Sequence, residues 1–267
     1  MHDLVWFNGQ IADASSAQIS ALSVAALYGN GVFTTVAVYG GEPFVWEKHL
    51  RRLTNDSARL HLDLSQFSDD AIRSGLDELL RRNKVLNGRA RITILDESPS
   101  DLWVTRSRST TSLLITTADF VALPNKLSLG ISPYSINSAS PLAGVKSSNY
   151  LERIVSRAES RLAGMDESIQ LNQRGDVVSA VMANVFWVKD GTLFTPALGT
   201  GCLPGTTREF VLESLVCEEV EVLVSELESA EEMFLTSAGI GVAQVSEFNG
   251  RRLGKHPHPI TSLLPRV

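Results

Sequence analysis

A lysine among small residues is the side chain best suited to covalent chemistry. Lys146 lies in the run Pro141-Leu-Ala-Gly-Val-Lys-Ser-Ser-Asn-Tyr150, in a loop without amphipathic spacing and directly before a helical pattern. A lysine amine can form an imine and then act as an acid–base group when a desolvated, positively biased pocket lowers its pKa. A solvated surface lysine is the alternative, but the small neighbours of Lys146 favour the chemical role.

Two threonines occupy a position suited to binding an anion. Thr206 and Thr207 follow Pro204-Gly205 and begin an expected helix that runs to about Leu215. Backbone N–H groups at a helix N-terminus bind phosphate, and a hydroxyl at that place adds a donor. A simple helix cap is the alternative, and the two roles are compatible.

Five segments fall in one order along nearly the whole chain: Tyr28-Gly-Asn-Gly-Val-Phe33-Thr-Thr, His49-Leu-Arg-Arg52-Leu, the Lys146 run, Ala183-Asn184-Val-Phe186-Trp and Leu203-Pro-Gly-Thr206-Thr207-Arg208. Together they resemble the motifs of the class IV (fold type IV) aminotransferase and lyase family. The lysine segment is most similar to that of the aminodeoxychorismate lyase branch. Any one match is weak, whereas five collinear matches are difficult to obtain by chance.

The resemblance implies pyridoxal 5′-phosphate (PLP) as the cofactor, held as a Schiff base by Lys146. It implies that Arg52 grips the cofactor phosphate, since a planar and permanently charged fork suits that anion. A solvated helix arginine, like Arg51 beside it, is the alternative. Thr206 and Thr207 would also contact the phosphate.

The resemblance further implies the residues around the reacting atoms. Thr34 is assigned a catalytic role beside the lysine, and Thr35 is assigned to substrate orientation. Tyr28 would pack beside cofactor and substrate. Tyr150 would border the ring near the lysine, with a core position as an equal alternative. Arg106 is a proposed partner for substrate carboxylates. No metal site is predicted.

Two positions depart from the family pattern. The usual partner of the pyridine nitrogen is a glutamate five residues before the Asn184 position, and this chain has Ser179 there. A carboxylate makes the ring a strong electron sink, whereas a hydroxyl offers only an ordinary hydrogen bond. The second departure is Ala238, where many relatives place another phosphate-binding hydroxyl.

A third difference favours the lyase branch. Transaminase relatives usually carry glutamate after Phe33, where this chain has Thr34-Thr35, as the lyase branch does. The expected reaction is therefore the elimination of pyruvate from 4-amino-4-deoxychorismate, which gives 4-aminobenzoate for folate biosynthesis. Lys146 would remove the proton from the amine-bearing carbon and later return one, while aromatisation drives the reaction. The alternatives are a branched-chain, D-amino-acid or amine transaminase, and a degenerate member that binds PLP without turnover.

Hydrophobic spacing predicts the elements that position these residues. Leu4 to Ile11 reads as a hairpin around Asn8-Gly9, and a strand is expected over 32–39. Helices are expected over 44–60, from Ser68, and over 149–162. Strands are expected over 90–95, 112–117, 177–181, 184–188, 221–224, 233–236 and 242–248, and a helical tail at the C-terminus.

The mixed order of strands and helices predicts an α+β fold with two domains. By resemblance this is the two-domain fold of D-amino-acid and branched-chain aminotransferases. The expected domains are an N-terminal α+β domain, 1–119, and an α+β barrel-like domain, 120–267, that carries the PLP lysine.

The composition argues against nucleic acid and membranes as partners. Acidic residues outnumber basic ones, 30 to 24, without a basic run, so nucleic acid is not expected. No stretch approaches the roughly 20 apolar residues that cross a bilayer, and the first residues do not form a signal peptide. With two cysteines, Cys202 and Cys217, a reducing cytoplasm is expected. The resemblance adds a small-molecule amino substrate and a homodimer.

Overall fold

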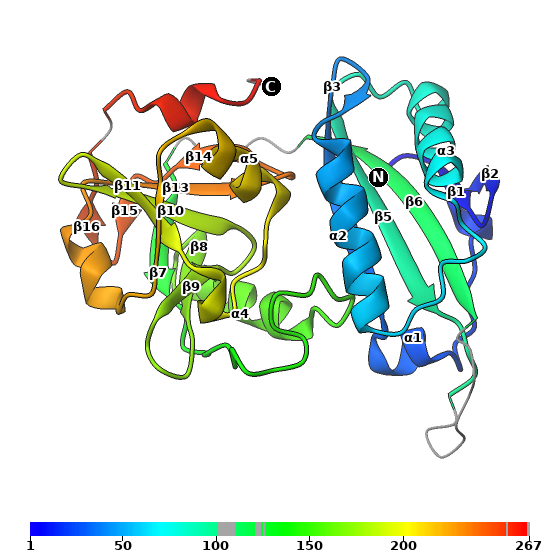
Figure 1. Ribbon diagram of the computed structural model, residues 1–267, viewed down its shortest axis with the longest axis horizontal. Coiled ribbons are helices and arrows are strands. Elements are labelled where there is room, and N and C mark those ends of the chain that lie inside the picture. Colours follow the sequence, from blue (N-terminus) through cyan, green and yellow to red (C-terminus); the bar gives the residue numbers. More distant parts are fainter. Residues whose placement is uncertain (101–109, 121–123, 125, 255, 266–267) are drawn as a thin grey trace. The chain divides into compact units, whose positions relative to one another are not determined.

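The computed structural model describes residues 1–100, 110–120, 124, 126–254 and 256–265. The chain forms two compact units. Unit 1 comprises Met1–Phe120 and the short segment Val145–Tyr150, whereas unit 2 comprises the described residues of Val121–Gly144 and Leu151–Arg266 (Figure 1). Both units combine helices with sheets, which confirms the α+β fold. Among the described residues, no helix has the length and apolar character needed to cross a membrane.

Unit 1 is built on a six-stranded antiparallel sheet with the order β2-β1-β6-β5-β3-β4. Its strands are β1 (Leu4–Phe7), β2 (Gln10–Asp13), β3 (Gly31–Tyr39), β4 (Glu42–Pro43), β5 (Gly88–Asp96) and β6 (Thr111–Asp119). Its helices are α1 (Val24–Tyr28), α2 (Trp46–Arg59) and α3 (Asp69–Arg82), with a 3-10 turn η1 (Ala14–Ser16).

Local signals explain several of these elements. The β1–β2 hairpin turns through Asn8 at φ 47° and Gly9 at φ 94°, the left-handed conformations that the Asn-Gly pair tolerates. Ser68 caps α3, because its side chain accepts a hydrogen bond from the backbone N–H of Ala71. The expected hairpin and the helices from 44 and 68 are thus confirmed within a few residues.

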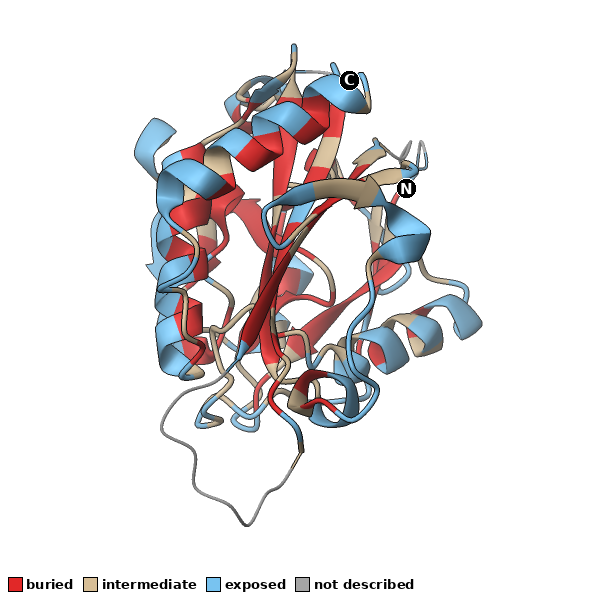
Figure 2. Ribbon diagram, turned by 90° about the vertical axis from the view of Figure 1, so that its right-hand side faces the viewer, coloured by how far each residue is buried: buried red, intermediate tan, exposed pale blue. Residues whose placement is uncertain are grey.

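One face of the unit 1 sheet is covered by α2 and α3. Val32 and Val36 of β3 share a buried cluster with Leu53 of α2 and Leu76 of α3. Figure 2 shows the helices buried on the side toward the strands and exposed on the opposite side. Because side chains alternate along a strand, Thr34 points to the helix side and its neighbours point to the other face.

Unit 2 contains two five-stranded sheets, with the orders β12-β11-β10-β13-β14 and β16-β15-β7-β8-β9. Its strands are β7 (Ser128–Ile131), β8 (Glu167–Leu171), β9 (Val177–Ala180), β10 (Asn184–Lys189), β11 (Thr192–Pro196), β12 (Glu218–Val220), β13 (Glu232–Ser237), β14 (Gly241–Gln244), β15 (Glu247–Phe248) and β16 (Arg251–Arg252). Its helices are α4 (Leu151–Leu162) and α5 (Thr206–Ser214), with 3-10 turns η2 (Leu198–Thr200), η3 (Val224–Ser229) and η4 (Pro259–Ser262).

Three expected elements of unit 2 differ in the structure. The strand expected over 242–248 is divided into β14 and β15, which belong to different sheets. The chain changes partner there, since Val245 N–H donates to Met233 O and Ser246 N–H donates to Leu127 O. The strand expected over 221–224 lies instead at Glu218–Val220, and the C-terminal tail has only the single turn η4 in its described part.

The lysine segment also differs from its expected place in the C-terminal domain, because Val145–Tyr150 packs with unit 1. The backbone explains this: Phe33 N–H donates to Lys146 O at 2.9 Å, and Ser148 N–H donates to Gly31 O at 2.8 Å. Strand β3 therefore holds the lysine segment through backbone hydrogen bonds. The spacing of residues along the sequence does not reveal such contacts between distant segments.

Candidate active site

The amine of Lys146 lies against two aromatic rings in unit 1. Its Nζ is 4.4 Å from the ring centroid of Phe33 and 5.4 Å from that of Tyr150. The two rings meet edge to face with centroids 5.3 Å apart. Lys146 itself is half-buried. The structure thus places Tyr150 beside the lysine, and an apolar wall flanks the amine on this side.

Asp56 of α2 anchors the lysine backbone and was not singled out from the sequence. Its Oδ2 accepts a hydrogen bond from the Lys146 N–H at 3.0 Å, and only 4% of the residue is exposed. Burial raises the pKa of this carboxyl, against the opposing effects of that hydrogen bond and of nearby cations. Asp56 lies one turn after Arg52, so helical spacing to Arg52 is a signal that could have identified it.

Arg52 is buried and is held by a series of hydrogen bonds on the helix side of β3. Its Nη2 donates to Thr34 Oγ1 at 2.8 Å, and the Thr34 oxygen lies 2.7 Å from Nδ1 of His49. Arg52 is 8% exposed, whereas its neighbour Arg51 lies on the exposed side of α2. Thr34 is fully buried on the helix side of β3, where its hydroxyl contacts Arg52 and His49, and the catalytic role assigned to it stays a prediction.

The surroundings of His49 favour the neutral form of its imidazole. Burial lowers its pKa well below the ordinary value of 6.5, and the charges of Arg52 and Lys146 lower it further. A neutral ring can accept the Thr34 hydroxyl hydrogen at Nδ1, because the Thr34 oxygen is already accepting from Arg52. The imidazole thus completes the support of the buried guanidinium without adding a charge.

Acidification should destabilise the protein through His49. The unfolded chain binds a proton near pH 6.5 while the folded site resists it, so stability is complete above pH 6.5 and falls as pH drops below it. Denaturant midpoints between pH 7.5 and 5 should show a weaker pH dependence in His49→Asn than in wild type. The exposed His61 supplies the control, and a loss of pH dependence in His61→Asn instead would contradict the assignment.

Replacing Arg52 should weaken PLP binding strongly. Arg52→Ala is expected to cost about 2–4 kcal/mol of PLP affinity, because a charged hydrogen bond is lost and a phosphate is left partly unpaired. Arg51→Ala should change the affinity little, since that side chain is exposed. Absorbance titration of the apo-proteins with PLP measures both values, and the opposite ranking would show that the position assigned within His49-Leu-Arg-Arg-Leu is wrong by one residue.

The face of β3 opposite the helices carries a second cation that sequence reasoning missed. Thr35 pairs directly with Arg91 of β5 in the sheet register. The Arg91 guanidinium lies 3.6 Å from the centroid of Phe33, the same ring that Lys146 approaches. An exposed arginine stacked near a reactive amine can bind a carboxylate. Only the strand pairing reveals it, because Phe33 and Arg91 are far apart in the sequence.

The Tyr28-Gly29 turn packs against the lysine segment. Gly29 ends α1 at φ 70°, and a Cβ there would lie 3.2 Å from Cα of Asn149. Close approach and backbone conformation therefore both require glycine. Tyr28 itself is 48% exposed, and its predicted place beside the substrate stays a prediction. Arg106 lies outside the residues that the structure describes.

Ser179 of β9 is a buried hydroxyl in unit 2. The residue is 2% exposed, and its Oγ has no hydrogen-bond partner among the residues that the structure describes. A buried hydroxyl without a hydrogen-bond partner lowers the free energy of unfolding by about 1–3 kcal/mol. Such an atom indicates a place where a bound group or water is accommodated.

The helix N-terminus in unit 2 has the geometry of an anion site. Helix α5 begins at Thr206 after Gly205, which has no side chain to cap it. Thr206 and Thr207 are both buried. Asn184 holds the preceding turn, since its Nδ2 donates to Leu203 O at 2.9 Å. The first-turn N–H groups and the helix dipole together favour an anion there.

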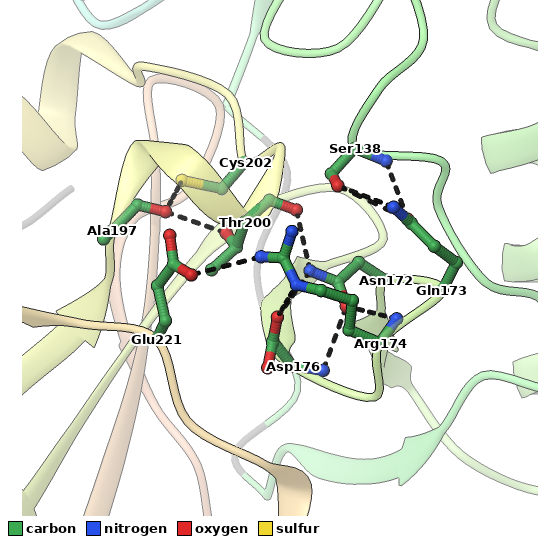
Figure 3. A network of polar contacts seen from close by, with 9 residues as sticks. All are labelled: Ser138, Asn172, Gln173, Arg174, Asp176, Ala197, Thr200, Cys202 and Glu221. Atoms are coloured by element: carbon green, nitrogen blue, oxygen red, sulfur yellow. Dashed lines mark hydrogen bonds and ion pairs between the residues drawn. The ribbon is translucent and has the colours of Figure 1, made fainter.

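A network around Asn172 fixes the turn that leads into β9 (Figure 3). The Asn172 carboxamide oxygen accepts from the backbone N–H of Arg174 and of Asp176. Its Nδ2 donates to Asp176 Oδ2 at 2.9 Å and to Thr200 O at 3.3 Å. One buried amide thereby joins the β8–β9 turn, whose second strand carries Ser179, to the η2 turn upstream of α5.

Comparison with known proteins places these features in a family. The model of the amino-transferase class IV family matches residues 31–248. The aminodeoxychorismate lyase of Bacillus subtilis is 26% identical over 270 residues, with 98% of this chain and 92% of that protein covered. The branched-chain-amino-acid aminotransferase of Escherichia coli is 27% identical over 272 residues, with coverages of 95% and 87%.

A solved structure gives the same result at the level of the fold. The branched-chain aminotransferase of Thermoproteus uzoniensis with norvaline superposes with a TM-score of 0.90 at 26% identity, covering 97% of this chain and 91% of that one. This superposition confirms the predicted fold, and the family match confirms the predicted PLP cofactor. The chain belongs to the class IV aminotransferase family of PLP-dependent enzymes.

Proposed function

We propose that this enzyme is a 4-amino-4-deoxychorismate lyase, which eliminates pyruvate and releases 4-aminobenzoate. The observation that carries the proposal is the neutral, buried hydroxyl of Ser179 at the position where the family usually has a glutamate. The same substitution of a hydroxyl for a carboxylate occurs at Thr34. A reaction that ends in an aromatic ring tolerates a weaker electron sink, because aromatisation drives it forward.

The residues of each unit fit PLP. In unit 1, Lys146 would bind the cofactor covalently, Arg52 would bind its phosphate and Tyr150 would border its ring. In unit 2, the Ser179 hydroxyl, which lacks a partner among the described residues, would face the pyridine nitrogen. Thr206 and Thr207 would add phosphate contacts at the start of α5. When bound, PLP supplies an aldehyde for the substrate amine and a ring that withdraws electrons from the adjacent carbon.

Lys146 would act as the acid–base group once the substrate amine has replaced it. Its Nζ would take the proton from the amine-bearing carbon and return one after pyruvate has left. The Asp56 hydrogen bond holds the Lys146 backbone in place, while the rings of Phe33 and Tyr150 flank the amine. Asp56 and Phe33 are thus positioning residues for the catalytic lysine.

Arg91 and Thr35 would orient the substrate. They pair across β3 and β5, on the face where the Phe33 ring meets the lysine amine. The substrate of the proposed reaction carries two carboxylates, and a guanidinium fork binds a carboxylate through two hydrogen bonds. Arg106 stays a proposed second partner.

A branched-chain aminotransferase is the second candidate. The 27% identity to the Escherichia coli branched-chain enzyme equals, within one per cent, the identity to the Bacillus subtilis lyase. Identity alone therefore does not separate the two reactions. Ser179 and Thr34 are the residues that favour the lyase.

We further propose a cytoplasmic homodimer. Helix α4 turns its serines inward, with Ser156 and Ser160 buried, and leaves an apolar side exposed. Leu151 is 66%, Ile154 58% and Leu162 81% exposed. A second copy that covers this face would remove it from water. Both cysteines are free, which suits a reducing compartment.

A product assay tests the proposed reaction. Aminodeoxychorismate is generated in a coupled reaction from chorismate and glutamine, and the PLP-loaded enzyme is added. Chromatography should then show 4-aminobenzoate that increases with enzyme concentration. An enzyme that binds PLP and forms neither 4-aminobenzoate nor a keto acid from amino acids would instead support the non-catalytic alternative.

A further inference from the structure

Thr236 is a buried hydroxyl to which neither the motifs nor the proposed mechanism gives a role. It is the fifth residue of β13 and has no exposed surface. Its Oγ1 has no hydrogen-bond partner within the described part of the chain. An unsatisfied buried hydroxyl destabilises a protein by about 1–3 kcal/mol, and its persistence indicates a partner that binds in the functional state.

The strand register shows which way Thr236 points. Thr236 pairs with Asn184, and Phe234 pairs with Phe186, across β13 and β10. Both phenylalanines share a buried cluster with Val211 of α5. Since residues two apart lie on one face of a strand, Thr236 and Asn184 point to the side that α5 covers.

The contacts of Asn184 show that this side of the two strands faces the beginning of α5. Its Nδ2 donates to Leu203 O, and a Cβ on Gly205 would lie 2.0 Å from its Oδ1. The turn that starts the helix therefore rests directly on Asn184. Because Thr236 is the cross-strand partner of Asn184, its side chain neighbours Asn184 on the face that carries this turn.

The beginning of α5 supplies the complementary half of an anion site. The helix has nine residues, and its first intrahelical acceptor, Gly205 O, is used by Glu209 N–H. The backbone N–H groups of Thr207 and Arg208 belong to the first turn, for which a helix provides no acceptor of its own. Gly205 lacks a Cβ that would otherwise collide with Asn184, so the backbone can approach the floor of the site closely.

We propose that Thr236 is a phosphate-binding residue of the PLP site, whose Oγ1 donates to a phosphate oxygen below the N-terminus of α5. This rests on the proposed role of Thr206 and Thr207 as phosphate ligands. It also explains why Ala238 is tolerated: the hydroxyl absent at position 238 is supplied two residues earlier, from within β13.

The substitution Thr236→Val tests the proposal, because valine keeps the shape and removes the hydroxyl. Titration of the apo-protein should show a PLP dissociation constant raised about tenfold, whereas Thr236→Ser should stay within about threefold of wild type. Pyridoxal, which has no phosphate, should bind Thr236→Val and wild type equally. Without cofactor, Thr236→Val should melt at the wild-type temperature or above it, since an unsatisfied hydroxyl has been removed.

Two results would overturn the proposal. One is wild-type PLP affinity in Thr236→Val, and the other is an equal loss of pyridoxal and PLP binding, which would make the hydroxyl a structural element. Thr207→Val serves as the reference variant. If Thr207→Val weakens PLP and Thr236→Val does not, only the role of Thr236 fails; if neither does, the α5 phosphate site itself is wrong.

Discussion

Replacing Lys146 by alanine should abolish both turnover and the covalent attachment of PLP. The lysine amine is expected to bind the cofactor and to carry the proton, so one substitution removes two functions. The expected loss of rate is at least about 10³-fold, toward the upper end of what a single acid–base group contributes. Borohydride reduction of wild type followed by peptide mapping should find the label on the peptide that contains Lys146.

The matched control is the exposed Lys126 of unit 2. Lys126→Ala should retain the label and the activity of wild type. A label on any other lysine, or an active Lys146→Ala enzyme, would contradict the assignment. Asp56→Asn gives an intermediate test: the label should stay on Lys146 while the rate falls, because the backbone anchor of the lysine is weakened.

Replacing Ser179 by glutamate should convert the enzyme toward transamination. A carboxylate at this position favours a protonated pyridine nitrogen, and the ring then withdraws electrons more strongly. Transamination of simple amino acids should rise about tenfold or more, since that reaction depends on stabilised negative charge at carbon. Pyruvate release should change far less, because the developing charge leaves with the enol ether oxygen.

Ser179→Gln separates charge from size. Glutamine fills the same space and is neutral, so it should not raise transamination, although both variants disturb a buried position. Steady-state rates for both reactions in wild type and the two variants supply the comparison. An equal rise in Ser179→Gln, or no rise in Ser179→Glu, would show that Ser179 does not control the cofactor ring.

Local sequence signals were enough to predict many of the elements and to single out Arg52 for the candidate site. Asn8-Gly9 defines a hairpin through its backbone conformation, and Ser68 defines a helix start through its hydroxyl. The resemblance to the family motif selects Arg52 over Arg51. The structure separates the same two residues by burial, because only one of two adjacent helix positions faces the sheet. Such features depend on neighbours within about one turn or one strand.

The remaining features depend on contacts between distant parts of the chain. Arg91 meets the Phe33 ring, which Lys146 also approaches, only through the pairing of β5 with β3. Asp56 meets the Lys146 backbone only because that segment packs with unit 1. The sequence did not reveal that Thr34 lies on the side of α2, where its hydroxyl accepts a hydrogen bond from Arg52. The break between β14 and β15 follows from a change of partner strand, for which no local residue gives a signal.

The most direct test of the lyase proposal is a parallel rate measurement on one preparation of the PLP-loaded enzyme. Pyruvate and 4-aminobenzoate are quantified with aminodeoxychorismate as substrate, and keto acid is quantified with leucine, isoleucine or valine and 2-oxoglutarate. The proposal predicts pyruvate and 4-aminobenzoate in a ratio of one to one, with slow or absent keto acid formation. Rapid keto acid formation without pyruvate release would contradict it and establish the enzyme as an aminotransferase.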